Sequence, residues 1–335
     1  MKISHKLLLV TFLILGACKE EVKKVENKTE TPKNIPSNVV KDIQVPIFDG
    51  NAAYNYVKKQ VEFGPRVPNS AGHKKCGDFL VNEFAKVGLS VIEQKAILTA
   101  FDGTKLNARN IIASLNPDAE KRILLMAHWD TRPFADQDSK DRTKPILGAN
   151  DGASGVAVLL EVANILVKDS LKIGIDIILF DAEDYGQPEG TMVSPKPDTY
   201  CLGSQYWAKN KHKANYKAEF GILLDMVGAK DAVFTKEGTS VYYAPQIVNK
   251  VWDIARYKGY EKYFSYQQTN PITDDHFYVN EIAKIPSIDI IHYDASTPSH
   301  FGKYWHTHND NLEAVDAQTL QIVGQVLLEV IYREN

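Results

Sequence analysis

The chain has 335 residues, of which 44% are hydrophobic and 24% are charged, and its formal net charge at pH 7 is −3. This composition supports a folded domain, and the lack of a basic stripe or an arginine cluster excludes nucleic acid as an expected partner. The three cysteines are Cys18, Cys76 and Cys201. Cys76 and Cys201 could pair in an oxidising compartment, and two free thiols are an equally good interpretation.

The N-terminus has the pattern of an export signal. Two lysines precede an apolar stretch, residues 7–15, which is too short to span a bilayer. The stretch leads into the sequence LGAC at residues 15–18, which resembles a bacterial lipoprotein box. We therefore expect residues 1–17 to be a lipoprotein signal peptide and the exported protein to be anchored by lipid on Cys18 at the cell envelope, in the periplasm or at the outer membrane. An ordinary secretory signal is the alternative.

Residues 18–44 contain mostly Lys, Glu, Asn, Thr and Pro, with few large apolar groups. Such a segment cannot bury enough surface to offset its ordering entropy, so we predict a disordered tether. From residue 45 onward, apolar runs alternate with amphipathic segments, without a Pro/Gly-rich linker or an internal repeat. We predict one catalytic domain over residues 45–335, monomeric and in contact with the membrane only through the lipid.

Four short apolar runs predict buried parallel strands, because they are rich in Ile, Leu and Val and do not alternate with polar residues. The runs are residues 123–127, 176–180, 221–224 and 285–291. Helical patterns lie between them, as in residues 155–167, and a last helix is expected from Asp316, as its N-cap, to residue 332. This alternation predicts an α/β fold with a mostly parallel central sheet flanked by helices on both faces.

Acidic residues and histidines follow the ends of these runs. Open α/β sheets bind ligands in the crevice beyond the carboxyl ends of their strands, so several such ends together predict a functional site. The residues concerned are His128 and Asp130, then Glu183 and Asp184, then Asp225, and finally His292 and Asp294.

Two acidic motifs within this set predict metal and acid–base chemistry. Asp151 lies in GANDGASG, a turn of small residues that opens a helix, where it could cap the helix or let a metal approach closely. Glu183 and Asp184 are adjacent, so their side chains leave the chain in different directions, and one can hold a metal while the other faces substrate. Adjacent acids are usually surface residues, but here an apolar strand delivers them to the active edge of the sheet.

His306 lies between Trp305 and Thr307, and it would complete a zinc site with Asp151 and Asp184. Three N/O ligands leave a fourth position for water or a substrate carbonyl, as catalytic zinc requires. The nearby His300 and His308 lack this context and are interpreted as loop residues.

The order of these motifs resembles that of the zinc aminopeptidase fold of peptidase family M28. Within it the sequence is most similar to the glutaminyl cyclases (glutaminyl-peptide cyclotransferases), in particular the animal-like type of some bacteria. The similarity runs from FGPR at residues 63–66 to the final helix. LDMVGA is shared with the peptidases, whereas DDH, WHT and Phe301 are more specific to the cyclases. The motifs are HxD at 128–130, GANDGASG at 148–155, ED at 183–184, LDMVGA at 224–229, DDH at 274–276 and WHT at 305–307.

The resemblance implies a reaction, a cofactor and a role for each matched residue. The reaction is the cyclisation of N-terminal glutaminyl residues of peptides and proteins to pyroglutamate with release of ammonia. A single zinc ion serves as cofactor. By resemblance, Asp151, Asp184 and His306 bind the zinc, Glu183 is the general acid/base, Asp225 and Asp274 form an acidic hydrogen-bonded network, and Phe301, Trp305 and Ile272 line the substrate pocket.

The chain departs from the animal enzymes in two ways. Asp184 stands where they have Glu, which moves the carboxylate and requires a compensating backbone shift. They also have a tryptophan shortly after that ligand, and residues 185–193 contain none. Three long loops, residues 134–147, 186–202 and 293–304, are expected to rim the site, because connections of this length are usually functional.

Other functions remain as alternatives at this point. A two-zinc aminopeptidase of the same fold is the strongest, because His128 and Asp225 occupy the positions where those enzymes hold the second metal. A peptide-binding lipoprotein without catalysis is disfavoured, since the metal ligands and the general base are all retained. A serine hydrolase is excluded, because the chain has no G-x-S-x-G motif.

Overall fold

The computed structural model describes residues 43–188, 194 and 196–335. The predicted signal peptide, residues 1–17, lies outside these residues, as does nearly all of the predicted tether, residues 18–44. Among the described residues, no helix combines the length and the apolar character that crossing a membrane requires.

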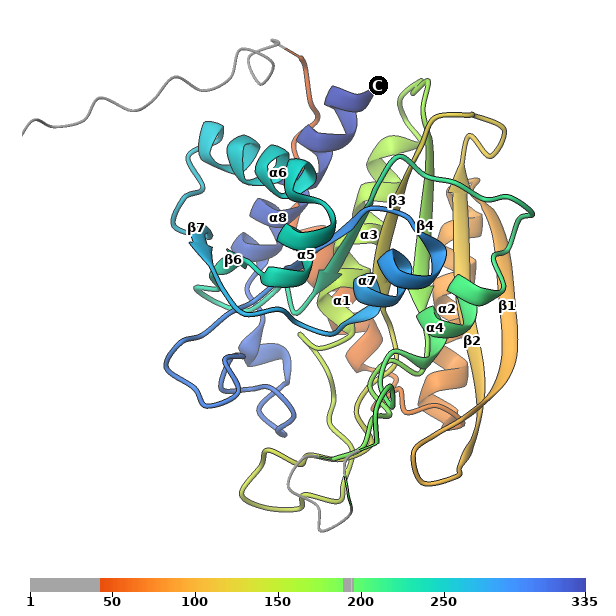
Figure 1. Ribbon diagram of the computed structural model, residues 1–335, viewed down its shortest axis with the longest axis vertical. Helices are drawn as coiled ribbons and strands as arrows, with labels where there is room; N and C mark the ends of the chain where they lie inside the picture. Colours follow the sequence, from red (N-terminus) through yellow and green to blue (C-terminus); the bar gives the residue numbers. More distant parts are fainter. Residues whose placement is uncertain (1–42, 189–193, 195) are drawn as a thin grey trace, which may run out of the picture. The chain divides into compact units, whose positions relative to one another are not determined.

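The centre of the domain is a six-stranded mixed sheet with the strand order β1-β2-β4-β3-β5-β8 (Figure 1). The four strands from β4 to β8 run parallel to one another, and β1 and β2 join them as an antiparallel hairpin. A separate two-stranded sheet pairs β6 with β7. The strands are β1 Ser90–Thr99, β2 Lys105–Leu115, β3 Arg122–His128, β4 Gly174–Phe180, β5 Gly221–Asp225, β6 Phe234–Lys236, β7 Phe264–Gln268 and β8 Ser287–Ile291.

The predicted α/β class and the four predicted parallel strands are confirmed as β3, β4, β5 and β8. The last prediction began two residues too early: β8 starts at Ser287, after Ile285 and Pro286. Proline has no backbone N–H to donate to a ladder, so the strand begins after it.

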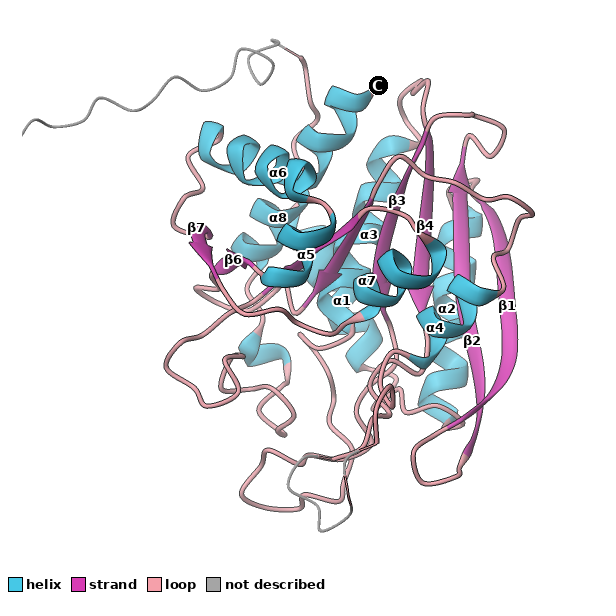
Figure 2. Ribbon diagram, in the orientation of Figure 1, coloured by secondary structure: helices cyan, strands magenta, loops and turns pink. Residues whose placement is uncertain are grey.

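Helices cover both faces of the sheet (Figure 2). Helices α1, α3 and α8 pack together on one face, while α4 and α7 lie against the other, followed directly by a π-helical turn at Val279–Ala283. The helices are α1 Gly50–Val61, α2 Ala71–Lys86, α3 Ala153–Leu166, α4 Leu202–Lys209, α5 Gly238–Tyr243, α6 Pro245–Tyr257, α7 Asp275–Tyr278 and α8 Ala317–Glu334, with a short 3₁₀ turn at Leu312–Ala314. The predicted last helix is confirmed, with Asp316 at the N-cap position, although its side chain makes no capping hydrogen bond.

The sheet separates two hydrophobic cores. Along β3, Leu125 and Ala127 belong to the larger core with α1, α3 and α8, and Leu124 and Met126 belong to the smaller core with α4. Successive side chains of a strand point to opposite faces, so a strand covered on both sides is apolar at most positions. This requirement explains the apolar runs in the sequence, and all seven residues of β3 are buried.

Gly155 sets how closely helix α3 approaches strand β5. A Cβ atom at this position would lie 2.2 Å from the backbone carbonyl oxygen of Leu224, a distance that no side chain can tolerate. The missing side chain therefore lets the start of α3 press against the end of β5. As a result, Asp151, just before α3, comes close to Asp225, the last residue of β5.

Candidate active site

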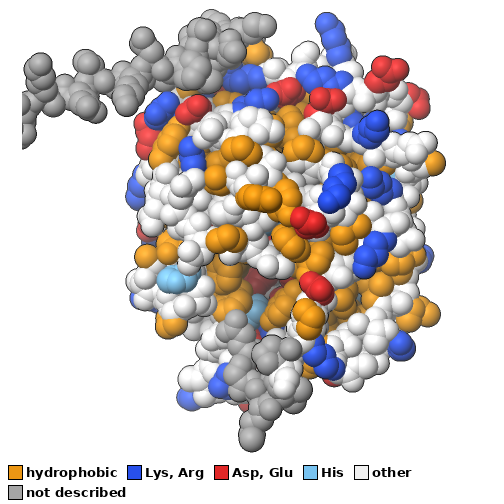
Figure 3. Space-filling model, in the orientation of Figure 1, with side chains coloured by type: hydrophobic (Ala, Val, Ile, Leu, Met, Phe, Trp, Pro, Cys, Tyr) orange, Lys and Arg blue, Asp and Glu red, His pale blue; other side chains and the backbone are white. Residues whose placement is uncertain are grey.

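A cavity of about 170 Å³ lies beyond the carboxyl ends of β4 and β5. All nine predicted site residues line it: Asp151, Glu183, Asp184, Asp225, Ile272, Asp274, Phe301, Trp305 and His306. The space-filling view shows acidic and histidine atoms at the bottom of a hollow between hydrophobic side chains (Figure 3). A larger groove, about 650 Å³, lies between α2 and the β1–β2 hairpin, but Arg109 pairs there with Asp78 and Glu93. The smaller cavity is therefore the candidate site.

Asp151, Asp184 and His306 form the predicted metal-ligand set. Nε2 of His306 lies 3.3 Å from Oδ1 of Asp184 and 3.9 Å from Oδ2 of Asp151, and one ligand atom from each residue falls within 4.8 Å of the others. All three side chains are buried, and Oδ2 of Asp184 has no hydrogen-bond partner within the described part of the chain. Three buried N/O donors with an unsatisfied carboxylate oxygen fit zinc.

The turn that carries Asp151 is fixed by buried polar groups. The carboxylate of Asp310 accepts hydrogen bonds from the backbone N–H groups of Asn150 and Asp151 at 2.7 and 3.0 Å. Arg66, fully buried, donates to the carbonyl oxygen of Gly148 at 2.6 Å. Helix α3 is capped by Gly152, without a side-chain hydrogen bond, so the helix-cap interpretation of Asp151 is wrong.

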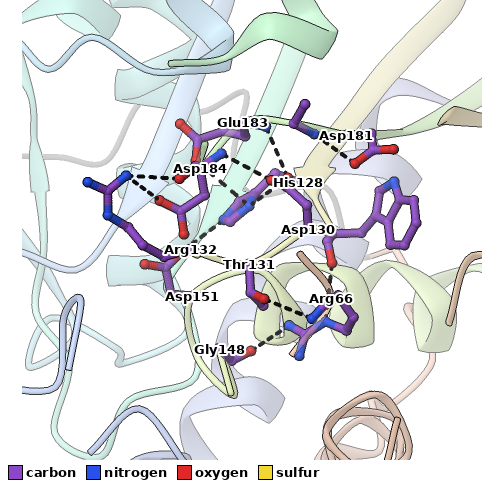
Figure 4. Close-up of polar contacts among 12 residues, drawn as sticks. Arg66, His128, Asp130, Thr131, Arg132, Gly148, Asp151, Asp181, Glu183 and Asp184 are labelled. Atoms are coloured by element: carbon purple, nitrogen blue, oxygen red, sulfur yellow. Dashed lines mark hydrogen bonds and ion pairs between the residues drawn. The ribbon is translucent and has the colours of Figure 1, made fainter. Parts of the chain in front are cut away.

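Glu183 and Asp184 are held by the aspartate of the HxD motif (Figure 4). The carboxylate of Asp130 accepts the backbone N–H of Glu183 at 3.0 Å and that of Asp184 at 3.2 Å. Ala182 just before them has a φ of 55°, in the left-handed region that non-glycine residues seldom adopt. The two consecutive carboxylates therefore leave a rigid turn, one beside His306 and the other beside Asp274 and Cys201.

The surroundings of Glu183 favour its protonated form. Burial raises the pKa of Glu183 well above its ordinary value, the charge on His128 opposes this shift, and Asp184 and Asp274 reinforce it. The thiol of Cys201 donates a hydrogen bond to Oε1 of Glu183 at 3.2 Å, which acts in the opposite direction and favours the carboxylate. A carboxyl group with a raised pKa can hold a proton and release it again, which is what general acid–base catalysis requires.

His128 lies between two carboxylates. Its Nε2 is 3.1 Å from Oδ1 of Asp151 and 3.1 Å from Oδ1 of Asp225. Burial lowers the pKa of His128, but hydrogen bonds to Asp130, Asp151 and Asp225 outweigh burial and hold that pKa well above its ordinary value. Burial also raises the pKa of Asp225 to about 7. His128, Asp151 and Asp225 thus lie close enough together to hold a metal ion, and His128 and Asp225 are the residues that a second zinc would need.

Asp274 belongs to a further group of buried acids. It is the N-cap of α7, and its Oδ1 accepts the backbone N–H of Asp275 at 2.5 Å. Asp289 on β8 lies near it, and burial raises the pKa values of Asp275 and Asp289 well above their ordinary range. Asp289 was not predicted, because a single acid inside an apolar strand carries no local signal of what it faces.

Aromatic rings form one wall of the cavity. The ring of Trp305 stacks on that of His306, with centroids 3.7 Å apart and planes inclined by 22°, and Phe301 lies 4.9 Å from Trp305. Tyr200 also lines the cavity, and its ring lies 5.1 Å from the Arg132 guanidinium. Tyr200 was missed in the sequence, where its only signal is its place in the loop of residues 186–202.

Several conspicuous residues lie outside the cavity. His308 pairs with Asp138 at 2.8 Å, and His300 stacks on Tyr293, as expected of loop residues. His292 bonds to the hydroxyl of Tyr304. The thiols of Cys76 and Cys201 are both free and buried, so the disulfide alternative is wrong for this pair.

Comparisons with known proteins identify the family of the chain. Residues 110–331 match the family model "Peptidase family M28". The chain is 52% identical to the glutaminyl cyclase of Bacteroides thetaiotaomicron, solved with N-acetylhistamine, covering 87% of this chain and 100% of that one with a TM-score of 0.85. It is 54% identical to a structure from Parabacteroides distasonis described as a Zn-dependent exopeptidase, covering 86% and 99% with the same TM-score.

A curated animal relative shows the same similarity. The glutaminyl-peptide cyclotransferase of Drosophila melanogaster is 27% identical over 287 residues, which span 78% of this chain and 75% of the relative. Zinc is named for the exopeptidase neighbour, and the buried Asp151, Asp184 and His306 fit that metal. The chain belongs to peptidase family M28, and within that family to the glutaminyl cyclases.

Proposed function

We propose that this protein is a glutaminyl-peptide cyclotransferase that converts N-terminal glutamine of peptides and proteins to pyroglutamate and ammonia. The observation that carries the proposal is the aromatic wall built directly on the metal site, where Trp305 stacks on His306 and Phe301 continues the surface. A small cavity with such a wall suits a folded glutaminyl side chain and limits the access of water. Water exclusion matters, because attack by water would give glutamate instead of the ring.

Asp151, Asp184 and His306 would hold one zinc ion per chain. When bound there, zinc supplies Lewis-acid polarisation of the γ-carboxamide carbonyl and stabilises the negative charge that develops on its oxygen. His128, Asp151 and Asp225 form a second group that could hold a metal ion, so the single ion rests on the resemblance to the glutaminyl cyclases, and the zinc stoichiometry tests it.

Glu183 would move the proton in this reaction. The substrate's own α-amine attacks the γ-carbon, which forms the ring C–N bond and breaks the bond to the carboxamide nitrogen. Glu183 takes the proton that the amine loses and gives it to the departing nitrogen, which leaves as ammonia. Asp225 and Asp274, which also line the cavity, would orient the amine by accepting its remaining hydrogen. Ile272, Phe301 and Trp305 would hold the alkyl chain of glutamine in its folded form.

Replacing Trp305 with alanine is expected to raise KM for a Gln-initiated peptide and to lower kcat/KM by about tenfold or more. The reason is the loss of a large apolar surface against the substrate and of the ring that fixes His306, where a single aromatic contact contributes about 1 kcal/mol beyond its burial. Steady-state ammonia release measures the effect. Trp305→Phe is the matched variant and should recover much of the loss; equal activity of all three proteins would contradict the assigned wall.

The proposed reaction is tested by mass spectrometry of a Gln-initiated peptide, with a Leu-initiated peptide alongside. Loss of the mass of ammonia from the first peptide, with no shortening of either, is the expected result. Removal of the first residue from the Leu peptide would instead identify a two-zinc aminopeptidase that uses His128 and Asp225. If neither peptide changes, the result would instead support a protein that binds peptides without catalysis.

We also propose that the protein is exported and anchored as a monomer through lipid on Cys18, on the basis of the LGAC sequence at residues 15–18. Detergent-phase partitioning of the full chain, compared with Cys18→Ala, tests the anchor. A wild-type chain that stays in the aqueous phase would contradict it.

A further inference from the structure

A buried arginine lies behind the metal ligands. The side chain of Arg132 is fully buried, and its Nε and Nη2 donate to the two carboxylate oxygens of Asp136 at 2.8 Å each. Its Nη1 donates to the backbone carbonyl oxygens of Asp184 at 2.9 Å and Gly186 at 3.2 Å. Figure 4 shows Arg132 reaching towards Asp184 from the loop that follows β3. One guanidinium group therefore ties the loop of residues 134–147 to the backbone of a metal ligand.

Asp136 in turn contacts a second metal ligand. Its Oδ1 lies 3.2 Å from Nδ1 of His306, whose other nitrogen, Nε2, faces Asp184 and Asp151. A neutral imidazole carries one N–H, and the negative charge of Asp136 beside Nδ1 favours the tautomer with the hydrogen on that nitrogen. The lone pair of Nε2 is then directed at the ligand cluster, which is the arrangement a metal needs.

The pairing with Arg132 keeps Asp136 suited to this role. Without Arg132 the carboxylate of Asp136 would lose the two donors that hold it in place beside Nδ1 of His306. Two parallel N–H donors fix the plane of its oxygens, because a bidentate guanidinium–carboxylate pair is both strong and directional. Asp136 and Arg132 are 4 residues apart in one loop, so they form the pair locally.

We propose that Asp136 and Arg132 are positioning residues for the metal site: Asp136 sets the tautomer and orientation of His306, and Arg132 fixes Asp136 together with the backbone of Asp184. Neither residue touches substrate in this assignment. The proposal deepens the proposed function, and it rests on that function only for the identity of the metal as zinc.

The contact of Arg132 with Asp184 is relevant to the difference between this sequence and the animal enzymes at residue 184. Asp184 is one methylene shorter than the glutamate of the animal enzymes, so its position depends closely on the backbone from which it extends. Arg132 holds this backbone at the carbonyl oxygens on either side of Tyr185. It also lies against the ring of Tyr200 in the cavity wall. Arg132 thus acts on both a ligand and the pocket.

The test is the zinc affinity of the full chain, measured by competition with a chromophoric chelator, for wild type, Asp136→Asn and Asp136→Ala. We expect the zinc dissociation constant to rise by 10- to 100-fold for Asp136→Ala, the usual cost of losing an outer-sphere partner of a metal-bound histidine. Asp136→Asn keeps the shape and one acceptor oxygen but loses the charge, so its dissociation constant should lie between those of wild type and Asp136→Ala.

Asp138→Asn is the matched control. Asp138 lies in the same loop and pairs with a histidine, His308, two residues after His306, but that pair lies outside the cavity. Its removal should leave the zinc dissociation constant within about twofold of the wild-type value. The melting temperature of each zinc-free protein separates a loss of fold from a loss of metal affinity.

Three outcomes of the zinc-binding measurement test the role of Asp136. Weaker zinc binding by both Asp136 variants but not by Asp138→Asn supports the proposal. Unchanged zinc affinity in both Asp136 variants, even with a lower melting temperature, would overturn it and leave the pair a structural role only. A wild-type protein that binds no zinc would instead overturn the metal site of the proposed function itself.

Discussion

Replacing Glu183 with glutamine is expected to lower kcat for glutamine cyclisation by at least about 10²-fold, while zinc content stays at the wild-type value. The amide has the shape of the carboxylate but cannot take a proton from the substrate amine and return it to the departing nitrogen. Ammonia release under saturating substrate measures the effect. Wild-type turnover by Glu183→Gln would remove Glu183 from the mechanism.

The control is a second glutamate whose pKa is raised by burial. Glu161 on α3 is buried, its pKa is raised above the ordinary value, and it lies outside the cavity. Glu161→Gln should therefore leave kcat unchanged. This comparison separates a loss of chemistry from the general effect of removing a buried acid.

The raised pKa of Glu183 also determines how activity and stability should change with pH. The carboxylate form is the base, so activity should rise as pH increases through this pKa, and this limb should be missing from any residual activity of Glu183→Gln. The contribution of Glu183 to folding stability should instead fall as pH increases. A carboxyl group with a raised folded-state pKa contributes stability below its unfolded pKa, and this contribution is lost as pH rises through the folded pKa. Glu183→Gln should therefore melt higher than wild type at alkaline pH.

Removal of zinc is expected to abolish cyclisation and to lower the melting temperature by several degrees. Ligand binding at 1,000 times its dissociation constant contributes about 4 kcal/mol to stability, which the zinc-free protein lacks. Dialysis against a chelator followed by titration with zinc, with ammonia release as the readout, gives both the loss and the recovery. Full recovery at one zinc per chain is the expected stoichiometry, and a requirement for two would support the aminopeptidase alternative.

His306→Ala should resist this recovery, because it lacks one of the three ligands. His308→Ala is the matched variant, since His308 lies two residues away and contacts Asp138 at the edge of the domain. It should regain activity with zinc as wild type does. Recovery of His306→Ala at the same zinc concentration would show that this histidine is not a ligand.

The sequence predicted the centre of the sheet well and its edge poorly. Strands β3, β4, β5 and β8 lie between two layers of helices, and burial on both faces makes them mostly apolar, with Asp176 and Asp289 as buried exceptions. The long β1–β2 hairpin was not predicted. Strand β1 has no fully buried residue, so it carries polar and charged side chains that read as a surface segment. Strand β2 pairs with β1 at ten positions, and this pairing cannot be predicted from a short stretch of sequence.

The candidate site shows a similar division. Asp151, Glu183, Asp184 and Asp225 follow strand ends or a small-residue turn, and that placement made them visible. His306 was predicted from its neighbours Trp305 and Thr307, and Asp274 from the resemblance to the glutaminyl cyclases. The supporting residues Arg132, Asp136 and Asp310 were not predicted, although they contact the ligands or their backbone. Each is a single charged residue in a loop, and its importance depends on a partner far away in the chain. The roles of the nine cavity residues stay predictions until the variants are measured.

The two hydrophobic cores have a consequence for how this sequence can change over time. Leu124 and Leu125 are neighbours in the chain, yet they contact different layers on opposite sides of β3. Substitutions in separate layers share no packing partners, so their effects on stability should add. Residues of one core can therefore be substituted without effect on the packing of the other core. A substitution that disturbs packing would be compensated by a second substitution in the same core. Homologues would then diverge as two separate sets of co-varying positions, joined only at the strand ends.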